Sequence, residues 1–155
     1  MDDLMDILTP EAVLAGVTVP NKKTLFQQLG AAAQRITGIE ARLIVDRLVE
    51  RERLGSTGFG EGVAIPHGKI EGLTQVVGVF AKLATPVDFQ SIDDMPVDLV
   101  FLLLSPPDSG VEHLKALARV SRRLRDRPFV AKLRGAGSND ALYALLTHAD
   151  ARDAA

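Results

Sequence analysis

Residues Val97 to Leu104 form an almost unbroken apolar run, and this run constrains the fold more than any other feature of the sequence. An alternating pattern would indicate a strand with one face in solvent, whereas a continuous run of this length is typical of a strand buried on both faces. Such a strand needs cover on both sides. Because segments with helical periodicity stand before and after it, the sequence predicts a layered α/β fold in which helices cover a β-sheet.

Helices are predicted where apolar residues recur every three or four positions. The first follows Asn21, whose side chain can cap it, and ends at Gly38. A second covers residues 40–53, a third covers 111–126, and a last one follows Ser138. The residues expected to face the core are Leu25, Leu29, Ala32 and Ile36 in the first helix, Ala41, Ile44, Val45 and Leu48 in the second, Leu114, Leu117, Ser121 and Leu124 in the third, and Leu142, Leu145 and Leu146 in the last.

Short β-rich runs predict three further strands, at residues 17–19, 63–65 and 76–83. Residues 85–96 contain two prolines with several acidic or amide side chains, and they are predicted as turns with room for one short strand. Residues 130–133 are ambiguous. The tail from Ala149 is expected to fray.

The composition limits the classes of protein that are possible. A chain of 155 residues with 46% hydrophobic residues has the size of one domain, here residues 1–155 with a core from about 4 to 147. It has no cysteine, which excludes disulfides, thiol catalysis and cysteine-bound zinc. No leader pattern and no apolar stretch of about 18 residues occur, so we expect a cytoplasmic protein without membrane insertion. The net charge of −2, the lack of tryptophan and the single tyrosine argue against nucleic-acid binding.

A glycine-rich stretch, Gly55 to Lys69, is the predicted place of the chemistry because it contains one histidine. The strand at Val63 to Ile65 is expected to end at Pro66, so His67 would stand at a strand end beside unhindered backbone N–H groups. An imidazole is neutral and nucleophilic near pH 7, and transfer of a phosphoryl group to it needs mainly positioning and charge stabilisation. A histidine in a polar loop can also have a purely structural role.

Gly58, Gly60 and Gly62 are candidates for a phosphoryl-binding loop, because backbone N–H groups in such a loop can act as donors to an anion. A tight loop without a ligand is the alternative. Their spacing is not the dinucleotide pattern G-x-G-x-x-G, and Gly68-Lys69 lacks the Ser or Thr of a phosphate-binding loop. No two histidines have metal-ligand spacing, and His148 is expected to face solvent. We therefore expect neither cofactor nor metal.

Three further features have both a structural and a functional interpretation. Arg51 lies on the inward side of the second helix near its end, where it can bind an anion or interact with the helix dipole. His113 opens the third helix after a sharp loop; helix N-termini favour anions, but a histidine there can also face solvent. The strands before His67 and before that loop both end nearby, so the two imidazoles are expected at one edge of the sheet. The arginine-rich run from 119 to 127 is a solvated face or a docking site for an acidic partner, with RNA as a lesser option.

The stretch from Arg51 to Lys69 resembles, without a gap, the active-site signature of enzyme IIA of the bacterial phosphotransferase system, mannitol/fructose class, and most of all its nitrogen-regulatory type. Weaker similarity extends from about Leu4 to Leu146. The resemblance implies a mixed sheet flanked by helices on both faces. It also implies that His67, after Ala-Ile-Pro, accepts phosphate from a histidine phosphocarrier protein. Arg51 would stabilise the phosphoryl group or bridge to the donor, and His113, in a Glu-His-Leu triplet, would hydrogen-bond a phosphoryl oxygen or orient His67.

The function predicted from these features is that of a phosphocarrier that regulates partner proteins, because a phosphoryl group changes the charge of an exposed site. A sugar-specific enzyme IIA that passes phosphate to an enzyme IIB is an alternative. A binding module in which His67 is structural is another. Residues 54–58 and 67–69 resemble the regulatory branch, and no IIB or membrane domain is fused to the chain, which favours the regulator.

Overall fold

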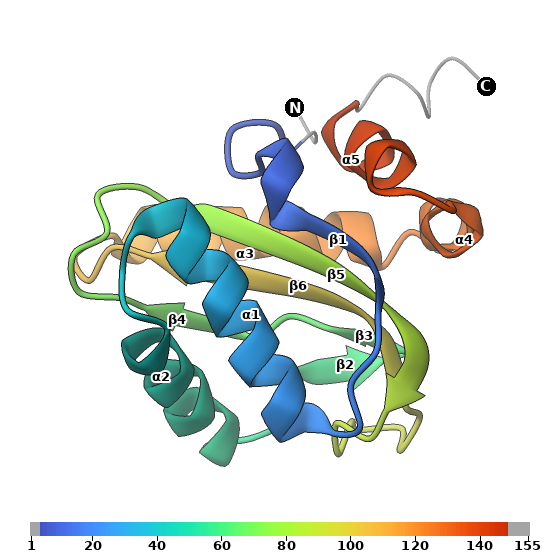
Figure 1. Cartoon of the computed structure of the whole chain (residues 1–155), viewed down its shortest axis with the longest axis horizontal. Coiled ribbons are helices and arrows are strands. Elements are labelled where there is room, and N and C mark those ends of the chain that lie inside the picture. Colours follow the sequence, from blue (N-terminus) through green and yellow to red (C-terminus); the bar gives the residue numbers. More distant parts are fainter. Residues whose placement is uncertain (1–3, 149–155) are drawn as a thin grey trace.

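The computed structural model describes residues 4–148, so the predicted fraying of the tail lies outside the described residues. Within them, six strands form one mixed sheet. Helix α1 (Lys22–Thr37) covers one face with α2 (Ala41–Arg53) beside it, and α3 (Gly110–Leu124) covers the other face (Figure 1). The predicted fold class, a mixed sheet with helices on both faces, is confirmed.

The centre of the sheet is the antiparallel pair of β5 (Val77–Val87) and β6 (Val97–Ser105). Every residue of β6 except Asp98 is buried, as the apolar run predicts. Strand β1 (Val13–Val17) runs parallel to β5. The strand order is β1-β5-β6-β3-β2, with β4 also paired to β6.

Two short strands, β3 (Val63–Ala64) and β4 (His67–Lys69), lie one after the other along the same edge of β6, and both are parallel to it. Strand β3 ends before Pro66, as expected, but His67 begins a further strand instead of standing at a strand end. Pro66 has no N–H, but its carbonyl accepts a 2.9 Å hydrogen bond from the N–H of Leu103, so the chain stays on β6 and pairing resumes at His67. The segment predicted as a glycine loop is also partly a strand: β2 (Gly58–Gly60) forms an antiparallel hairpin with β3.

Two other strand boundaries differ from the prediction. The strand expected at 17–19 is wrong, because β1 ends at Val17. Gly16 has a φ of 68°, and the register shifts between Leu14 and Val17, so a bulge obscures the strand pattern there. Strand β5 continues to Val87, beyond the predicted end at residue 83. Its register with β6 shifts between Lys82 and Val87, and this irregular stretch accommodates Pro86, which cannot donate a hydrogen bond.

The helix ends follow the capping signals. The Asn21 side chain accepts a 2.8 Å hydrogen bond from the N–H of Thr24, and Gly38 ends α1 with a φ of 77°. Helix α5 (Asn139–Thr147) is capped by Ser138, as predicted. The ambiguous residues 130–133 belong to a further helix, α4 (Arg127–Gly135), capped by the Asp126 side chain.

The predicted inward face of α3 is right only in part. Leu124 is buried as expected, but Leu114 is 66% exposed, and His113, Ala116 and Val120 are buried. The predicted stripe, which begins at Leu114, and the observed one, which begins at His113, have the same spacing and are offset by one residue. Hydrophobicity alone therefore favours the stripe that contains the leucines. A buried hydrogen bond of 2.6 Å between His113 Nδ1 and Ser105 Oγ accompanies the observed choice.

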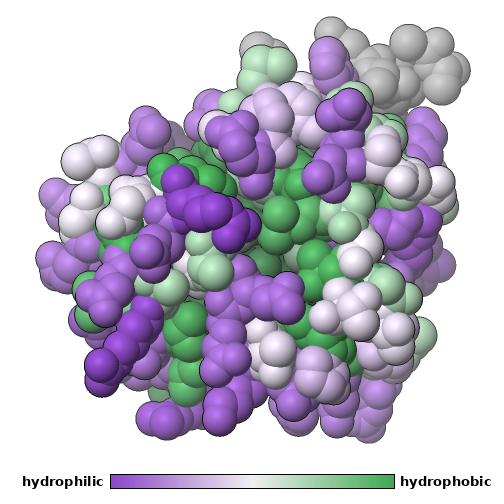
Figure 2. Space-filling model, in the orientation of Figure 1, coloured by the Kyte–Doolittle hydropathy of each residue, from purple (hydrophilic) through white to green (hydrophobic). Residues whose placement is uncertain are grey.

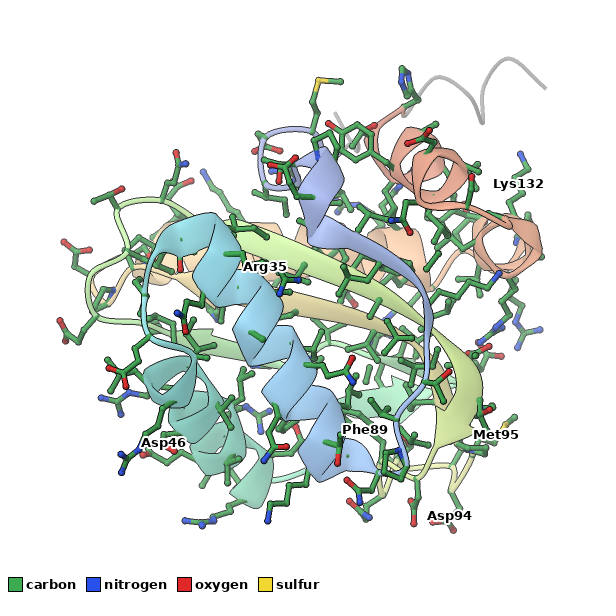
Figure 3. The ribbon with its side chains drawn as sticks, in the orientation of Figure 1. Arg35, Asp46, Phe89, Asp94, Met95 and Lys132 are labelled. Atoms are coloured by element: carbon green, nitrogen blue, oxygen red, sulfur yellow. The ribbon has the colours of Figure 1, made fainter. Side chains whose placement is uncertain are left out.

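The core lies between the sheet and the helices. Phe89, two residues after the end of β5, packs edge-on against Phe26 of α1 with ring centroids 5.9 Å apart. The loop that continues from it carries the exposed Asp94 and Met95 (Figure 3). On the face that carries α1, polar side chains cover most of the surface and apolar ones show in small patches between them (Figure 2). In residues 4–148, none of the helices has the length and apolarity to cross a bilayer.

Candidate functional site

Three of the residues named from the sequence meet where β4 lies beside the end of β6. Arg51 comes from the last turn of α2, His67 is the first residue of β4, and His113 lies in the first turn of α3. They line one hollow of about 420 Å³. The other lining residues are Arg47, Glu50, Leu54, Gly68 and Lys69.

The two ring nitrogens of His67 have different partners. Nδ1 lies 2.8 Å from the carbonyl oxygen of Ile65, which can only accept, so Nδ1 carries the hydrogen. Nε2 faces the Nε–H of Arg51 at 3.3 Å and is therefore the nitrogen with the lone pair. At this length the contact with Arg51 is weak. The arrangement leaves Nε2 as the nucleophilic atom.

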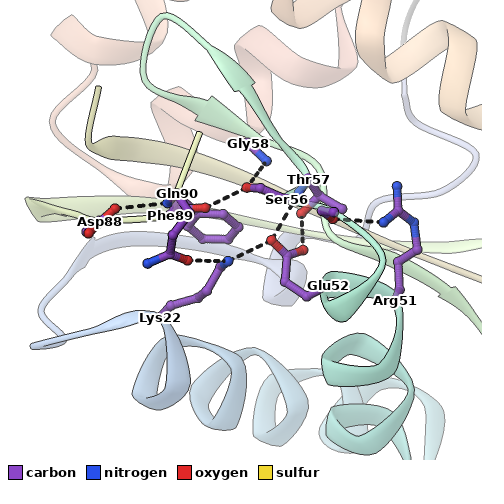
Figure 4. A network of polar contacts seen from close by, with 10 residues as sticks. Lys22, Arg51, Glu52, Ser56, Thr57, Gly58, Asp88, Phe89 and Gln90 are labelled. Carbon is purple, nitrogen blue, oxygen red and sulfur yellow. Dashed lines mark hydrogen bonds and ion pairs between the residues drawn. The ribbon is translucent and has the colours of Figure 1, made fainter. Parts of the chain in front are cut away.

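Arg51 is oriented by the loop between α2 and β2. Its Nη1 donates to the carbonyl of Gly55 at 2.9 Å. The loop is closed by Glu52, whose Oε2 accepts from the Thr57 N–H at 3.0 Å and whose Oε1 accepts from Thr57 Oγ1 at 2.6 Å (Figure 4). Lys22 of α1 pairs with the same carboxylate at 2.7 Å. We call Glu52, Thr57 and Lys22 the Glu52 clamp.

His113 stands beside His67 with the ring centroids 5.6 Å apart and the rings tilted by 50°. Its Nδ1 is occupied by Ser105 Oγ, so its Nε2 is the nitrogen left for a ligand. When Ser105 donates to Nδ1, the hydrogen of the neutral ring is on Nε2. In that tautomer, the pair His113–Ser105 offers a donor beside the ring of His67.

Both imidazoles are kept neutral near pH 7. Burial lowers the pKa of His67 below its ordinary value; the bond to the Ile65 carbonyl opposes this, and the charge of Arg51 adds to it. Burial also lowers the pKa of His113, with smaller contributions from the charges of His67 and Lys69. The lining of the hollow contains three cationic side chains, Arg47, Arg51 and Lys69, and one carboxylate, Glu50. This excess of positive charge favours the binding of an anion.

Gly58, Gly60 and Gly62 do not line this hollow. The N–H of Gly58 donates to Ser56 Oγ at 3.1 Å, and a Cβ at Gly58 would collide with Ser91 Oγ. A side chain at Gly58 is therefore excluded by the close approach of the loop that follows β5. A phosphoryl-binding role of the three glycines stays a prediction without a supporting contact.

No three His, Asp or Glu side chains within residues 4–148 come together in a group that could hold a metal ion. His148 is exposed at the end of α5.

The chain matches the family model for the EIIA 2 component of the phosphoenolpyruvate-dependent sugar phosphotransferase system over residues 6–149. It belongs to this enzyme IIA family. It is 48% identical over 143 residues to a nitrogen regulatory protein of Bradyrhizobium diazoefficiens, which covers 92% of this chain and 94% of the relative. The crystal structure of nitrogen regulatory protein IIA-Ntr from Neisseria meningitidis superposes with a TM-score of 0.87 at 34% identity, over 92% of this chain and 97% of the other. IIA mannitol of Escherichia coli, at 24% identity, has the same fold, with a TM-score of 0.74 over 90% of this chain and 98% of the other.

The family predicted from the sequence is therefore confirmed. In this enzyme IIA, two residues at the site were not singled out from the sequence. Glu52 directly follows Arg51 at the start of the stretch that resembles the family signature, and that position was the available signal. Ser105 is the first polar residue after the apolar run of β6, which placed it at the sheet edge without indicating its partner.

Proposed function

We propose that His67 accepts a phosphoryl group at Nε2 from a histidine phosphocarrier protein, and that the protein regulates partner proteins in the cytoplasm according to its phosphorylation state. The observation that carries the proposal is the pair of contacts on His67. Nδ1–H is fixed by the Ile65 carbonyl, and Nε2 keeps its lone pair beside a guanidinium. The regulatory role is supported by the nitrogen regulatory proteins to which the chain is similar.

In the transfer step, the lone pair of His67 Nε2 forms a new bond to phosphorus. The bond between phosphorus and the donor imidazole breaks, and the donor nitrogen keeps the electron pair. The hydrogen on Nδ1 stays in place, so no general base is needed. The depressed pKa of His67 favours the step, because only the neutral imidazole is nucleophilic.

Arg51 and His113 stabilise the transferred group. The 3.3 Å contact between Arg51 and Nε2 is weak enough to give way to the incoming phosphorus, and the guanidinium can then donate to a phosphoryl oxygen. The Nε2–H of His113 donates to a second oxygen when Ser105 donates to Nδ1. Such donors, fixed before the reaction, lower the barrier by stabilising charge.

The surface beside the hollow suits a protein donor. Leu54, which lines the hollow, is 84% exposed, and Val111 and Leu114, which flank His113 in sequence, are 64% and 66% exposed. Apolar side chains around a basic hollow are typical of the centre of a protein–protein interface. Phosphorylation would place a dianion in this surface and change which partners bind.

The test is to incubate the protein with phosphoenolpyruvate, the first enzyme of the phosphotransferase system and the phosphocarrier protein. We expect one phosphoryl group, labile in acid and stable in base, on the wild type and on the control variant His148→Ala, and none on His67→Ala. Phosphate on His67→Ala, with that lability, would refute the assignment. Adding an enzyme IIB then separates the two enzyme IIA functions, since a regulator should keep its phosphate and a sugar-specific carrier should lose it.

A further inference from the structure

A second hollow, of about 520 Å³, lies between the β2–β3 turn and the corner from α3 to α4. Its apolar lining comes from β3, the end of α3 and one face of α4, and consists of Val63, Leu124, Val130 and Ala131. Its polar lining is Arg125, Arg127, Arg134 and Glu61. None of these residues lines the hollow at His67, so the two hollows are separate.

The three arginines differ in how far their hydrogen-bonding capacity is used. Arg134 donates to both oxygens of Asp98 and to the carbonyl of Glu61, so it is a structural residue. Arg127 pairs with one oxygen of Glu61 at 2.6 Å, and its side chain is 83% exposed.

Arg125 has no carboxylate partner among residues 4–148. Its Nε donates to Ser121 Oγ at 3.0 Å, and its guanidinium lies 5.1 Å from the centroid of the Phe59 ring. These two contacts orient the group and leave its terminal nitrogens for another acceptor.

Glu61 is the only acidic residue of the lining, and it is held in an uncommon backbone conformation. Its φ is 57°, in the left-handed region that residues other than glycine rarely adopt. Asp93 accepts from its N–H at 2.9 Å, Arg134 donates to its carbonyl, and Arg127 binds its carboxylate. The Glu61 carboxylate therefore binds the Arg127 guanidinium at the rim of the hollow, where an external anion would otherwise bind.

We propose that this hollow binds a small molecule that carries an oxyanion, phosphate or carboxylate, on an apolar body. The oxyanion replaces the Glu61 carboxylate on Arg127 and also binds Arg125, while the body lies over Ala131, in front of the buried side chains of Val63, Leu124 and Val130. Guanidinium groups match the paired oxygens of both oxyanions. A volume of about 520 Å³ lies within the range of small-molecule sites, about 300–1,000 Å³. The site needs no phosphorylation of His67, so it stands apart from the function proposed above.

The test is an NMR titration of the ¹⁵N-labelled full chain with phenyl phosphate, benzoate and inorganic phosphate. The first two share an aromatic body and differ in the oxyanion, and the third lacks the body. We expect saturable shifts at Val63, Arg125 and Ala131 with at least one aromatic probe. The probe that binds more tightly identifies the oxyanion, and inorganic phosphate should bind at least tenfold more weakly than that probe.

Three variants and one control make the test specific. Arg125→Gln and Arg127→Gln should each weaken binding about tenfold or more, whereas Glu61→Gln should strengthen it, because the competing carboxylate is gone. Arg42→Gln, an exposed change on α2, should have no effect. Absence of saturable binding, equal binding of inorganic phosphate, or unchanged affinity in the three hollow variants would overturn the proposal.

Discussion

Each nitrogen of His67 is committed to one task by a single neighbour. The Ile65 carbonyl, two residues before the histidine, keeps the hydrogen on Nδ1, and Arg51 faces Nε2. In the proposed transfer, this fixed tautomer would remove the need to move a proton before attack. The contribution of each neighbour to that transfer can be measured separately.

Substitution of Arg51 tests the stabilisation of charge. Hydrogen bonds from charged donors are worth about 1.5–3 kcal/mol, so Arg51→Ala should slow phosphoryl transfer to His67 by about 10- to 150-fold. Arg51→Lys keeps the charge without the planar fork and should recover only part of the rate. The measurements are single-turnover transfer kinetics and thermal unfolding. A normal transfer rate combined with a large loss of stability would make Arg51 a structural residue.

Ser105 and His113 are predicted to act as one unit. His113→Ala should slow transfer by about 5- to 150-fold, equivalent to about 1–3 kcal/mol, and still allow some phosphorylation because His67 remains. Ser105→Ala leaves the ring present but frees Nδ1, so the hydrogen can move away from Nε2 and the rate should fall by a smaller factor. The double variant should be no slower than His113→Ala alone. The tautomer of His113, read from ¹⁵N shifts, should change in Ser105→Ala; an unchanged tautomer and rate would contradict the proposed role.

At the scale of elements, the site is assembled from parts that do not adjoin in sequence. The end of α2, the start of β4 and the first turn of α3 each supply one residue, and each is fixed by its own local interaction. The Glu52 clamp fixes α2: it joins the helix end to Thr57 and to Lys22 of α1, so that the Gly55 carbonyl faces Arg51 (Figure 4). In the proposed transfer, Glu52 would therefore act through Arg51.

Glu52→Gln tests the clamp. The amide keeps one acceptor for Thr57 but loses the charge that pairs with Lys22, and the side chain is only 8% exposed. We expect a loss of about 1–3 kcal/mol in the free energy of unfolding and a slower transfer, because the loop that holds Arg51 is loosened. The pKa of His67 should also fall further, since the Glu52 charge raises it. Asp46→Asn is the matched control, because Asp46 is exposed on the same helix and does not line the hollow; equal effects of the two changes would refute the clamp.

Across the whole molecule, the sequence predicted what depends on local signals. The buried strand β6, the cap at Asn21 and the end of α1 at Gly38 all follow from patterns within a few residues. What it could not give depends on partners far along the chain. Pairing resumes after Pro66 because the distant β6 offers Leu103, and α3 turns His113 inward, where it meets Ser105. The two imidazoles were predicted to meet at one edge of the sheet and they do, whereas Gly58, Gly60 and Gly62 do not line the hollow, and the hydrogen bonds of the site needed the fold.

The two buried imidazoles also make the stability of the whole molecule depend on pH. Burial lowers the pKa of both His67 and His113 in the folded protein, whereas both titrate near 6.5 in the unfolded chain. Between the lowered pKa and 6.5 the unfolded chain binds more protons, so the free energy of unfolding rises with pH through this window and falls on acidification. Each histidine contributes at most about 1.4 kcal/mol per pH unit. The ion pair of Asp6 with Arg119 affects a separate window, because it lowers the pKa of that carboxyl below 3.8.

Urea unfolding at pH 7.5, 6.5 and 5.5 measures this dependence. The wild type should lose stability below pH 6.5, and His67→Gln and His113→Gln should each have a shallower slope, because one titrating group is gone. The slope of the double variant should be shallower than that of either single variant. His148→Gln, exposed at the end of α5, is the control and should keep the slope of the wild type. If all four variants lose stability with the wild-type slope, the acid sensitivity arises elsewhere and the two rings are not held neutral by their burial.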